Sequence, residues 1–440
     1  MILVPSFVEL LQPLQAVMTV PTFGNLLTVL TGWVYARRRT VTGMIVSADA
    51  VGKKHHSTFH RLFAQASWSL DALGLAVFAM IEPWLDTDEP IMLALDDTLA
   101  RKRGRKVFGV GMHHDPLISS RKTAVVNWGH SWVVLSVLVK FPFCDRRVFA
   151  LPILFRLYLN KNAADKHRRA YRTRPQLAVR MLGVLCWAYK SRRFHVIADS
   201  AYGGQSVLNR LPGNCDLTSR LLLDARLYDP PPARQPGKRG RPRKRGQRLP
   251  TPRQMLEPRP QRARRIELNL YGRHQSARVN DIEARVYAAP GRPLRIVAVQ
   301  PLTGGRTMQA FYSTVHDATA EQVLMLYAMR WAIEVTFHDA KQHLGFEQPQ
   351  GWSRRAVERT APMAMVLYSL ILLWFAKVGH RLYQPPNRPW YPHKPHASFA
   401  DMLTTVRTAG VRESFLATPL IGRGSRKIMQ ILLHAYQQAA

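Results

Sequence analysis

One stretch of the chain places an acid, two bases and a tyrosine at helical spacing. It reads Tyr327-x2-Arg330-x3-Glu334-x6-Lys341. An α-helix turns by about 100° per residue, so these four side chains would project within about 60° of one another. A carboxylate on such a stripe can bind a metal ion, and the two bases can bind phosphate. Because a solvated face with paired charges has the same spacing, the stripe needs support from the rest of the chain.

Two predicted strands end in acidic residues. Residues 91–95 form a continuous apolar run that is followed by Asp96 and Asp97. Residues 194–198 form a second such run, which is followed by Asp199. Runs of this kind are typical of buried strands, and the ends of adjacent strands in an α/β sheet meet at one crevice, so we expect these acids to lie together. Neighbouring strand residues face opposite sides, so only one of Asp96 and Asp97 can point into that crevice.

The acidic positions together favour a magnesium or manganese site. Asp96 or Asp97 would combine with Asp199 and Glu334. Charged groups at the ends of apolar strands are costly unless they are paired or bind a metal. Since the set contains carboxylates and neither a thiol nor a paired histidine motif, it suits the hard cations Mg²⁺ and Mn²⁺. Two such ions can activate a water or a hydroxyl and stabilise the leaving oxygen of a phosphodiester.

The other members of the stripe suit contacts to a nucleic acid. Arg330 can bind a phosphate beside the reacting one through two donors, and Lys341 can do so as a point charge. Tyr327 can form a hydrogen bond or stack. The chain carries 63 Lys+Arg against 28 Asp+Glu, a formal net charge of +35. This excess predicts a polyanionic partner, with nucleic acid as the first candidate and an acidic membrane surface as the second.

Neither a disulfide framework nor a membrane span is expected. The three cysteines are far apart in the sequence and form no C-x-x-C pair, which fits a reducing cytoplasm. Residues 10–36 are apolar, but Pro13, Pro21 and several polar residues would break a spanning helix. Residues 361–376 are short for a span. We interpret both stretches as buried core helices.

The coarse pattern predicts an α/β fold with helical regions at both ends. From residue 90 the expected order is strand–strand–strand–helix–strand–helix–strand, which is typical of a mixed α/β sheet. Residues 237–246 are rich in Lys, Arg and Gly and cannot form a core. The overall charge favours an arm that lies along a phosphate backbone, and a solubilising loop is the alternative. The expected N-terminal segments are a helical, DNA-binding region of helix-turn-helix type at 1–88 and a first part of the catalytic core at 89–225. A basic flexible arm at 226–265 and a β-rich insertion at 266–316 would follow. A catalytic helix that begins near Thr319 would lie within 317–350, before a helical region at 351–440.

Three blocks of the sequence resemble the catalytic blocks of bacterial insertion-sequence transposases. They are Asp96-Asp97-Thr98, residues 198–203 (Ala-Asp-Ser-Ala-Tyr-Gly), and the Tyr-Arg-Glu-Lys stripe at 327–341. Together they are most similar to the group of the DDE superfamily that carries a Y-R-E-K signature. The resemblance spans roughly residues 90–350. The first block of this family usually reads Asp-x-Thr, so the resemblance selects Asp96 as the first catalytic acid.

The resemblance implies an RNase H-like catalytic domain with a mainly β insertion between Asp199 and Glu334. It also implies cut-and-paste transposition, in which Mg²⁺-dependent hydrolysis at the transposon ends precedes attack of a 3′-hydroxyl on target DNA. Asp96 and Asp199 would share one metal ion, and Asp96 and Glu334 would flank the other. The implied partners are terminal inverted repeats and target DNA, bound by a homodimer in a synaptic complex at the nucleoid of the bacterial cytoplasm, without a membrane partner.

Three other functions stay open on the sequence. An RNase H-like nuclease or resolvase would cut DNA without joining it, and a basic DNA-binding protein would do neither. A membrane-associated protein would use the apolar N-terminal region. The run His113-His114-Asp115 has residue types that bind metals, and we interpret it as an ordinary loop segment.

Overall fold

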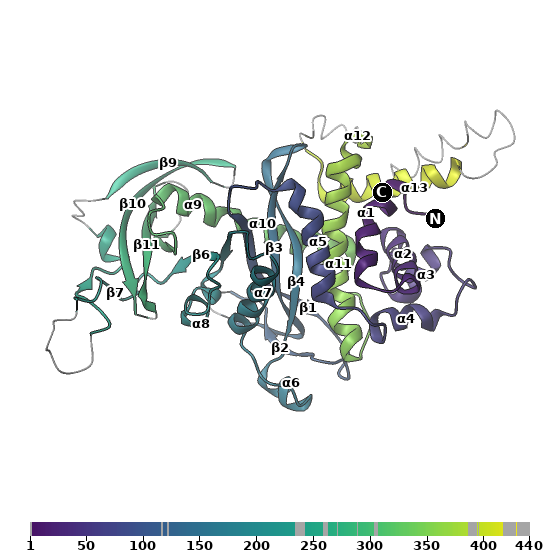
Figure 1. Cartoon of the computed structure of the whole chain (residues 1–440), viewed down its shortest axis with the longest axis horizontal. Helices are drawn as coiled ribbons and strands as arrows, with labels where there is room; N and C mark the ends of the chain where they lie inside the picture. Colours follow the sequence, from purple (N-terminus) through teal and green to yellow (C-terminus); the bar gives the residue numbers. More distant parts are fainter. Residues whose placement is uncertain are drawn as a thin grey trace. The chain divides into compact units, whose positions relative to one another are not determined.

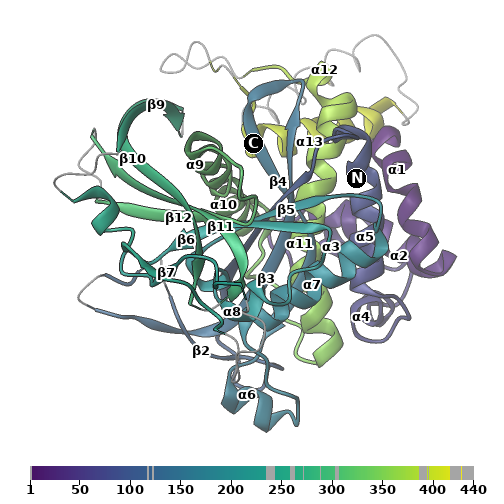
Figure 2. The ribbon, with the colours of Figure 1, turned by 60° about the vertical axis from the view of Figure 1, so that its left-hand side comes forward.

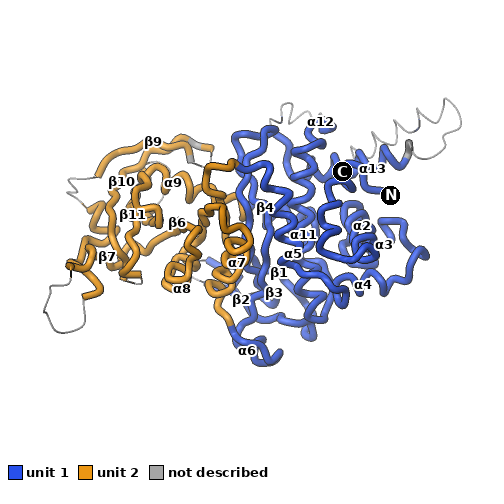
Figure 3. The backbone as a smooth tube through the Cα atoms, in the orientation of Figure 1, with its two compact units in different colours: residues 1–85, 97–171, 334–440 blue, residues 86–96, 172–333 orange. Residues whose placement is uncertain are grey.

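The computed structural model describes most of the chain. The described residues are 2–115, 118–120, 123–233, 243–257, 263–270, 272–287, 289–302, 307–385, 394, 396–416 and 428. The basic arm expected at 226–265 therefore lies partly outside the described residues, as does the run 237–246. The described chain divides into two compact units (Figure 3). Unit 1 comprises residues 1–85, 97–171 and 334–440, and unit 2 comprises residues 86–96 and 172–333.

A parallel group of strands forms the centre of unit 2. Strand β1 (Ile91–Arg101) contributes its first residues, which pair in parallel with β5 (Phe194–Ala198). On its other side β5 pairs in parallel with β6 (Cys215–Leu221). The connection to β5 is α7 (Arg174–Ala188), which starts with a capping box between Thr173 and Gln176. The apolar runs predicted as buried strands are therefore buried strands, and they are neighbours.

An antiparallel β-region follows Asp199 in the same unit. Strand β12 (Gln309–Ser313) pairs with β6, and β11 (Ala289–Pro301) and β10 (Arg273–Val286) extend the sheet (Figures 1 and 2). The remaining strands on this side are β9 (Arg264–Leu270), β7 (Leu227–Tyr228) and β8 (Arg248–Leu249). Short helices accompany the sheet as η3 (Ser200–Tyr202), α8 (Gln205–Leu208), η4 (Gln254–Leu256) and α9 (Ala320–Met329). This is the mainly β insertion that the resemblance implied.

Unit 1 combines a long antiparallel hairpin with two groups of helices. Strands β3 (Val126–Phe141) and β4 (Cys144–Tyr158) form the hairpin, and β2 (Gly111–His114) pairs with β3. The N-terminal helices are α1 (Pro5–Leu11), η1 (Gln12–Val17), α2 (Val20–Tyr35), α3 (Val41–Ser47), α4 (His56–Ala64), α5 (Leu70–Ile81) and η2 (Glu82–Trp84). The others are α6 (Lys161–Lys166), α10 (Trp331–Leu344), α11 (Arg354–Trp374), η5 (Phe375–Gly379), α12 (His380–Leu382) and α13 (Phe399–Leu416). The predicted class, an α/β fold with an RNase H-like mixed sheet and helical terminal regions, is confirmed.

Helix α11 is the core of unit 1. It contacts α1, α4, α5, α13 and strand β4, and every side chain from Thr360 to Trp374 is buried. The Ser369 hydroxyl donates to the carbonyl oxygen of Pro152 on β4 at 3.0 Å. Among the described helices, Arg354–Leu382 is long and apolar enough to cross a membrane, but 89% of its apolar window is buried by the rest of the protein. Such burial is typical of a core helix and agrees with our interpretation of residues 361–376.

Two glycines on α2 provide a matched test of how the N-terminal helices pack. A Cβ on Gly32 would lie 1.9 Å from the carbonyl oxygen of Met44 on α3, whereas a Cβ on Gly24 would meet nothing within 4 Å. We therefore expect Gly32→Ala to lower the free energy of unfolding by about 1–3 kcal/mol through overpacking. We expect Gly24→Ala to raise it by up to about 1 kcal/mol, since alanine favours the helix. Denaturant unfolding of both variants checks this, and equal effects would contradict the close approach of α2 and α3.

Candidate active site

Asp96 and Asp199 lie at the same edge of the sheet in unit 2. Strands β1 and β5 run parallel, with Leu95 opposite Ala198. Asp96 and Asp199 are the next residues on their strands, and paired strands lie about 4.8 Å apart. Asp97 belongs to unit 1. The structure thus brings Asp96 and Asp199 together within one unit, and the choice of Asp96 over Asp97 as the first catalytic acid stays a prediction.

The residues around Asp199 hold its backbone in a defined turn. The Asp199 carboxylate accepts from the backbone N–H of Ser200 at 2.5 Å, and its carbonyl oxygen accepts from the Ser219 hydroxyl at 3.0 Å. The Tyr312 hydroxyl donates to the carbonyl oxygen of Gly203 at 2.8 Å. A Cβ on Gly203 would lie 2.6 Å from Ser219 Oγ, so a side chain here would displace the Ser219 hydroxyl from its bond to Asp199. Residues 198–203 are therefore a compact turn that carries the acid at the end of β5.

Arg330 and Tyr327 lie beside these acids. The Arg330 guanidinium forms an ion pair with the Asp96 carboxylate at 2.5 Å, and the two side chains are 14% and 16% exposed. The same guanidinium lies 5.7 Å from the centre of the Tyr327 ring, which packs against Phe311 at 4.6 Å. Burial raises the pKa of Tyr327 to about 12, against an opposing effect of Arg330 and with a smaller contribution from Asp199. Tyr327 is therefore a neutral hydrogen-bond donor at neutral pH.

Arg220 is a further cation at this edge that the sequence analysis missed. It follows Ser219 on β6, its side chain is exposed, and its charge acts to lower the pKa of Tyr327. In the sheet Arg220 is opposite Phe311 on β12. The register of β6 against β12, about 90 residues later in the chain, was not readable from the sequence.

The predicted single helix around the stripe is wrong. The capping box of Thr319 and Gln322 starts α9 where we predicted it, but α9 ends at Met329 and α10 begins at Trp331. At the break, the backbone N–H of Arg330 donates to the Tyr327 carbonyl, three residues back instead of four. The rotation of about 100° per residue in a single helix therefore does not apply across the whole stretch from Tyr327 to Lys341. Within α10, Glu334 and Lys341 remain two turns apart on one face.

Lys341 belongs to a partly buried network in unit 1. Burial lowers the pKa of Lys341, while Glu347 and Asp115 act to raise it. The Asp115 side chain is 2% exposed and accepts from Arg101 at 2.9 and 2.8 Å. It also accepts from the Asn127 amide at 2.8 Å. Asp115 is therefore a buried acceptor that organises basic side chains.

Lys102 and the histidines His113 and His114 also belong to unit 1. The Lys102 ammonium donates to the carbonyl oxygens of Glu347 and Pro349 at 2.8 and 2.9 Å, and burial lowers its pKa to about 8. His113 and His114 lie on strand β2, not in a loop as we expected. The strand was missed because its four residues do not form an apolar run.

The candidate metal ligands are divided between the two units. Asp96 and Asp199 belong to unit 2, and Glu334 belongs to unit 1. In the part of the chain that the structure describes, no group of three or more His, Cys, Asp or Glu side chains is arranged to hold a metal ion. The paired strand ends do present two carboxylates, the hard oxygen donors that Mg²⁺ and Mn²⁺ prefer. The residues of unit 2 therefore fit a divalent ion, and participation of Glu334 stays a prediction.

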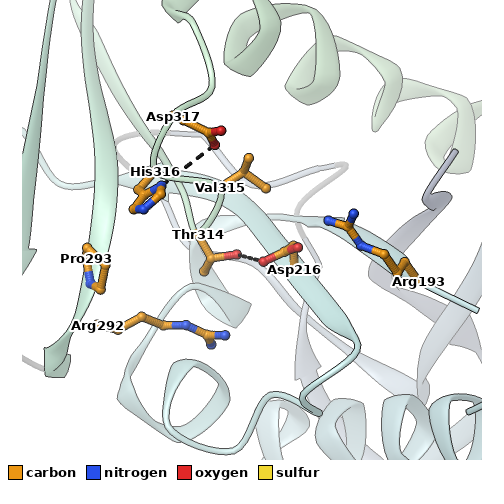
Figure 4. Close-up of a pocket in the computed structure, with 8 residues that line it drawn as sticks. All are labelled: Arg193, Asp216, Arg292, Pro293, Thr314, Val315, His316 and Asp317. Atoms are coloured by element: carbon orange, nitrogen blue, oxygen red, sulfur yellow. Dashed lines mark hydrogen bonds and ion pairs between the residues drawn. The ribbon is translucent and has the colours of Figure 1, made fainter.

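A pocket of about 300 Å³ lies at the opposite ends of the unit 2 strands (Figure 4). Its lining includes Arg193, Asp216, Arg292 and Thr314, and the Thr314 hydroxyl donates to the Asp216 carboxylate at 2.7 Å. Arg193 precedes β5 whereas Asp199 follows it, a separation of roughly 20 Å along the strand. Since two arginines and two aspartates line the pocket, its charge is nearly balanced. This pocket contains none of the predicted site residues.

Comparison with known proteins supplies the family context. A family model described as DDE superfamily endonuclease matches residues 23–278, which is more than half of the chain. The matched region contains Asp96 and Asp199 and ends before Glu334. It begins within α2, so the family relationship extends further toward the N-terminus than the resemblance that we placed at residues 90–350. No curated protein matches the chain.

Proposed function

Since the chain belongs to the DDE superfamily endonucleases, we propose that it is the transposase of an insertion sequence. Enzymes of this superfamily are nucleases that use divalent metal ions and act on DNA. The finer proposal is that this protein cuts transposon-end DNA and joins the freed 3′-hydroxyl to target DNA. The observation that carries it is the position of Asp96 and Asp199, which directly follow the paired segments of the parallel strands β1 and β5.

The roles of the acids follow from their positions. Asp96 and Asp199 would hold a divalent ion, Mg²⁺ or Mn²⁺, and Glu334 would complete the ligand set. Bound metal would supply activation of the attacking oxygen and stabilisation of the leaving oxygen of the phosphodiester. The backbone turn at 198–203 keeps the Asp199 carboxylate at the strand end, so little reorganisation is needed when substrate binds.

The basic residues and the tyrosine would bind the DNA backbone. Arg330 is paired with Asp96, so its guanidinium is held where a phosphate adjoining the reacting one would lie. Tyr327 can donate a hydrogen bond, because its raised pKa keeps the phenol protonated. Lys341 would bind a further phosphate as a point charge. These contacts position the DNA, and they do not read its sequence.

The net charge supports DNA as the partner. A formal net charge of +35 favours association with a polyanion. We propose terminal inverted repeats and target DNA as the substrates and a homodimer in a synaptic complex as the active assembly. The proposed location is the bacterial cytoplasm, at the nucleoid.

A strand-transfer assay tests the proposal. Purified protein is incubated with duplexes that carry the inverted repeats of its element and with a supercoiled target plasmid, with Mg²⁺ or Mn²⁺ present. We expect end cleavage and covalent joining of the 3′ end to the plasmid. Cleavage without joined product would favour the nuclease or resolvase alternative, and binding without cleavage would favour a non-catalytic DNA-binding protein.

A further inference from the structure

Two exposed basic segments lie close together in unit 1. One is the loop that follows β1, at residues 103–106, and the other is α6 with the turn after it, at residues 161–169. We call the two segments together the α6 basic surface. It lies at one end of unit 1, and α12 lies at the opposite end (Figures 1 and 3). Its exposed cations are Arg103, Arg105, Lys106, Lys161, Lys166, Arg168 and Arg169.

The charge of this surface is almost entirely positive. Its two segments contain one acid, Asp165, against seven arginines and lysines. No described side chain forms a hydrogen bond or ion pair with these seven cations. The Lys161 ammonium lies 5.8 Å from the centre of the Tyr171 ring, at cation–π distance. The surface thus has a concentrated positive charge that the described part of the protein does not neutralise.

The two segments are braced against each other. His167 accepts through Nε2 from the backbone N–H of Gly109 at 3.1 Å, and its ring packs on Phe108 at 4.4 Å. The backbone N–H of Phe108 donates to the Trp352 carbonyl at 2.9 Å, and His130 contacts the Phe108 carbonyl at 2.8 Å. The loop after β1 is therefore fixed to the turn after α6 and to the interior of unit 1.

Asn160 links α6 to strand β2. Its side-chain oxygen accepts from the backbone N–H of Ala163 and so caps α6, at 2.9 Å. Its amide nitrogen donates to the Met112 carbonyl on β2 at 3.4 Å. Gly109 has a φ of +70°, and a Cβ there would lie 2.8 Å from side-chain atoms of Leu157 and Leu159. These constraints hold the backbone of both segments in a defined arrangement.

Arg168 occupies a backbone position that favours glycine. It follows the C-cap of α6 with a φ of +50°, in the left-handed region. Helices commonly place glycine or asparagine at this position, because a side chain there is strained. The next residue, Arg169, donates its backbone N–H to the Ala164 carbonyl at 2.8 Å and closes the turn. An arginine in a strained position on a positive surface points to a requirement for its charge.

We propose that the α6 basic surface binds the sugar-phosphate backbone of duplex DNA. Unpaired cations on a braced backbone suit a rigid polymer with regularly spaced phosphates. The choice of DNA as the polyanion rests on the proposed function. The α6 basic surface belongs to unit 1, whereas the acids Asp96 and Asp199 belong to unit 2.

The salt dependence of DNA binding tests this proposal. We expect the variant Arg105→Gln, Lys106→Gln, Lys166→Gln and Arg169→Gln to bind duplex DNA at least about tenfold more weakly at 0.1 M salt. The slope of log K against log salt should fall by up to about 3.6, since each phosphate contact contributes about 0.9. Binding is measured with EDTA present, so no cleavage is needed. Circular dichroism and denaturant unfolding establish that the variant is folded.

A charge-matched variant provides the control. Lys140→Gln, Arg146→Gln, Lys377→Gln and Arg381→Gln also remove four exposed positive charges from unit 1, away from the α6 basic surface. We expect this control variant to lower the slope of log K against log salt by less than half as much as the variant of the α6 basic surface does. Equal slopes for the two variants would overturn the proposal, as would a loss of binding to single-stranded DNA or anionic vesicles with duplex binding intact. Duplex binding by a protein that never cuts DNA would instead remove the transposase proposal and leave this one standing.

Arg168→Gly separates binding from a structural role. Glycine relieves the strained φ, so the variant should unfold at a higher denaturant concentration than the wild type. It should nevertheless bind duplex DNA up to about tenfold more weakly, with a slope lower by about 0.9. Lower stability together with unchanged binding would show that the arginine serves the fold.

Discussion

Asp199→Asn is expected to lower the rate of DNA-end cleavage by at least about 10³-fold, equal to about 4 kcal/mol in the activation free energy. Asparagine keeps the size of the side chain and can still accept from the backbone N–H of Ser200. It removes the negative charge that would hold the divalent ion. We expect DNA binding in EDTA to stay within about threefold of wild type, because binding depends mainly on phosphate contacts. Single-turnover cleavage of an end duplex with Mg²⁺ or Mn²⁺ provides the measurement.

Three further variants define which acids matter. Asp96→Asn is expected to match Asp199→Asn, because the two acids directly follow the paired segments of β1 and β5. Asp97→Asn should lower the cleavage rate by less than about tenfold, since neighbouring strand residues face opposite sides. Asp216→Asn is the matched control, because this acid lies at the pocket near the other end of the unit 2 strands and its amide can still accept from Thr314. Full cleavage by the Asp199→Asn protein, or a greater loss with Asp97→Asn than with Asp96→Asn, would refute the assignment.

Trp374→Ala is expected to lower the free energy of unfolding by about 3–5 kcal/mol. Trp374 is fully buried at the end of α11, its indole N–H donates to the Ser6 hydroxyl at 3.0 Å, and its ring lies 6.1 Å from Phe7. Removal of the ring leaves a cavity between α11 and α1 and an unpaired hydroxyl on Ser6. Denaturant unfolding, followed by circular dichroism, measures the loss. Trp352→Ala is the control, because that side chain is 69% exposed, and we expect it to cost less than about 0.5 kcal/mol.

The same variant separates a core helix from a membrane span. If α11 is the core of a folded unit, the Trp374→Ala protein should be destabilised to the same extent with and without detergent micelles. A helix that crosses a bilayer would have this surface covered by lipid, so the wild-type protein would then require detergent to stay in solution. Detergent dependence of the wild-type protein would therefore contradict the assignment of α11 as a core helix.

Much of the fold was predictable because the signals are local. The apolar runs that end in Asp96 and Asp199 are strands, since a continuous run of this length must be buried on both faces. The helix was expected to begin near Thr319, and α9 begins there with a capping box, whose hydrogen bonds join residues three apart. The mainly β insertion followed from the resemblance and from short alternating runs between residues 266 and 315.

The sequence by itself determined the class of the fold, the acids at the strand ends and the positive charge, because each depends on residue type and near neighbours. Only the tertiary structure showed that the helix breaks at Arg330 and that this side chain pairs with Asp96, 234 residues away. It also placed Arg220 beside Tyr327 and organised basic side chains around Asp115. Contacts of this kind depend on strand register and on burial across long stretches of chain. The spacing of Tyr327, Arg330, Glu334 and Lys341 cannot specify them.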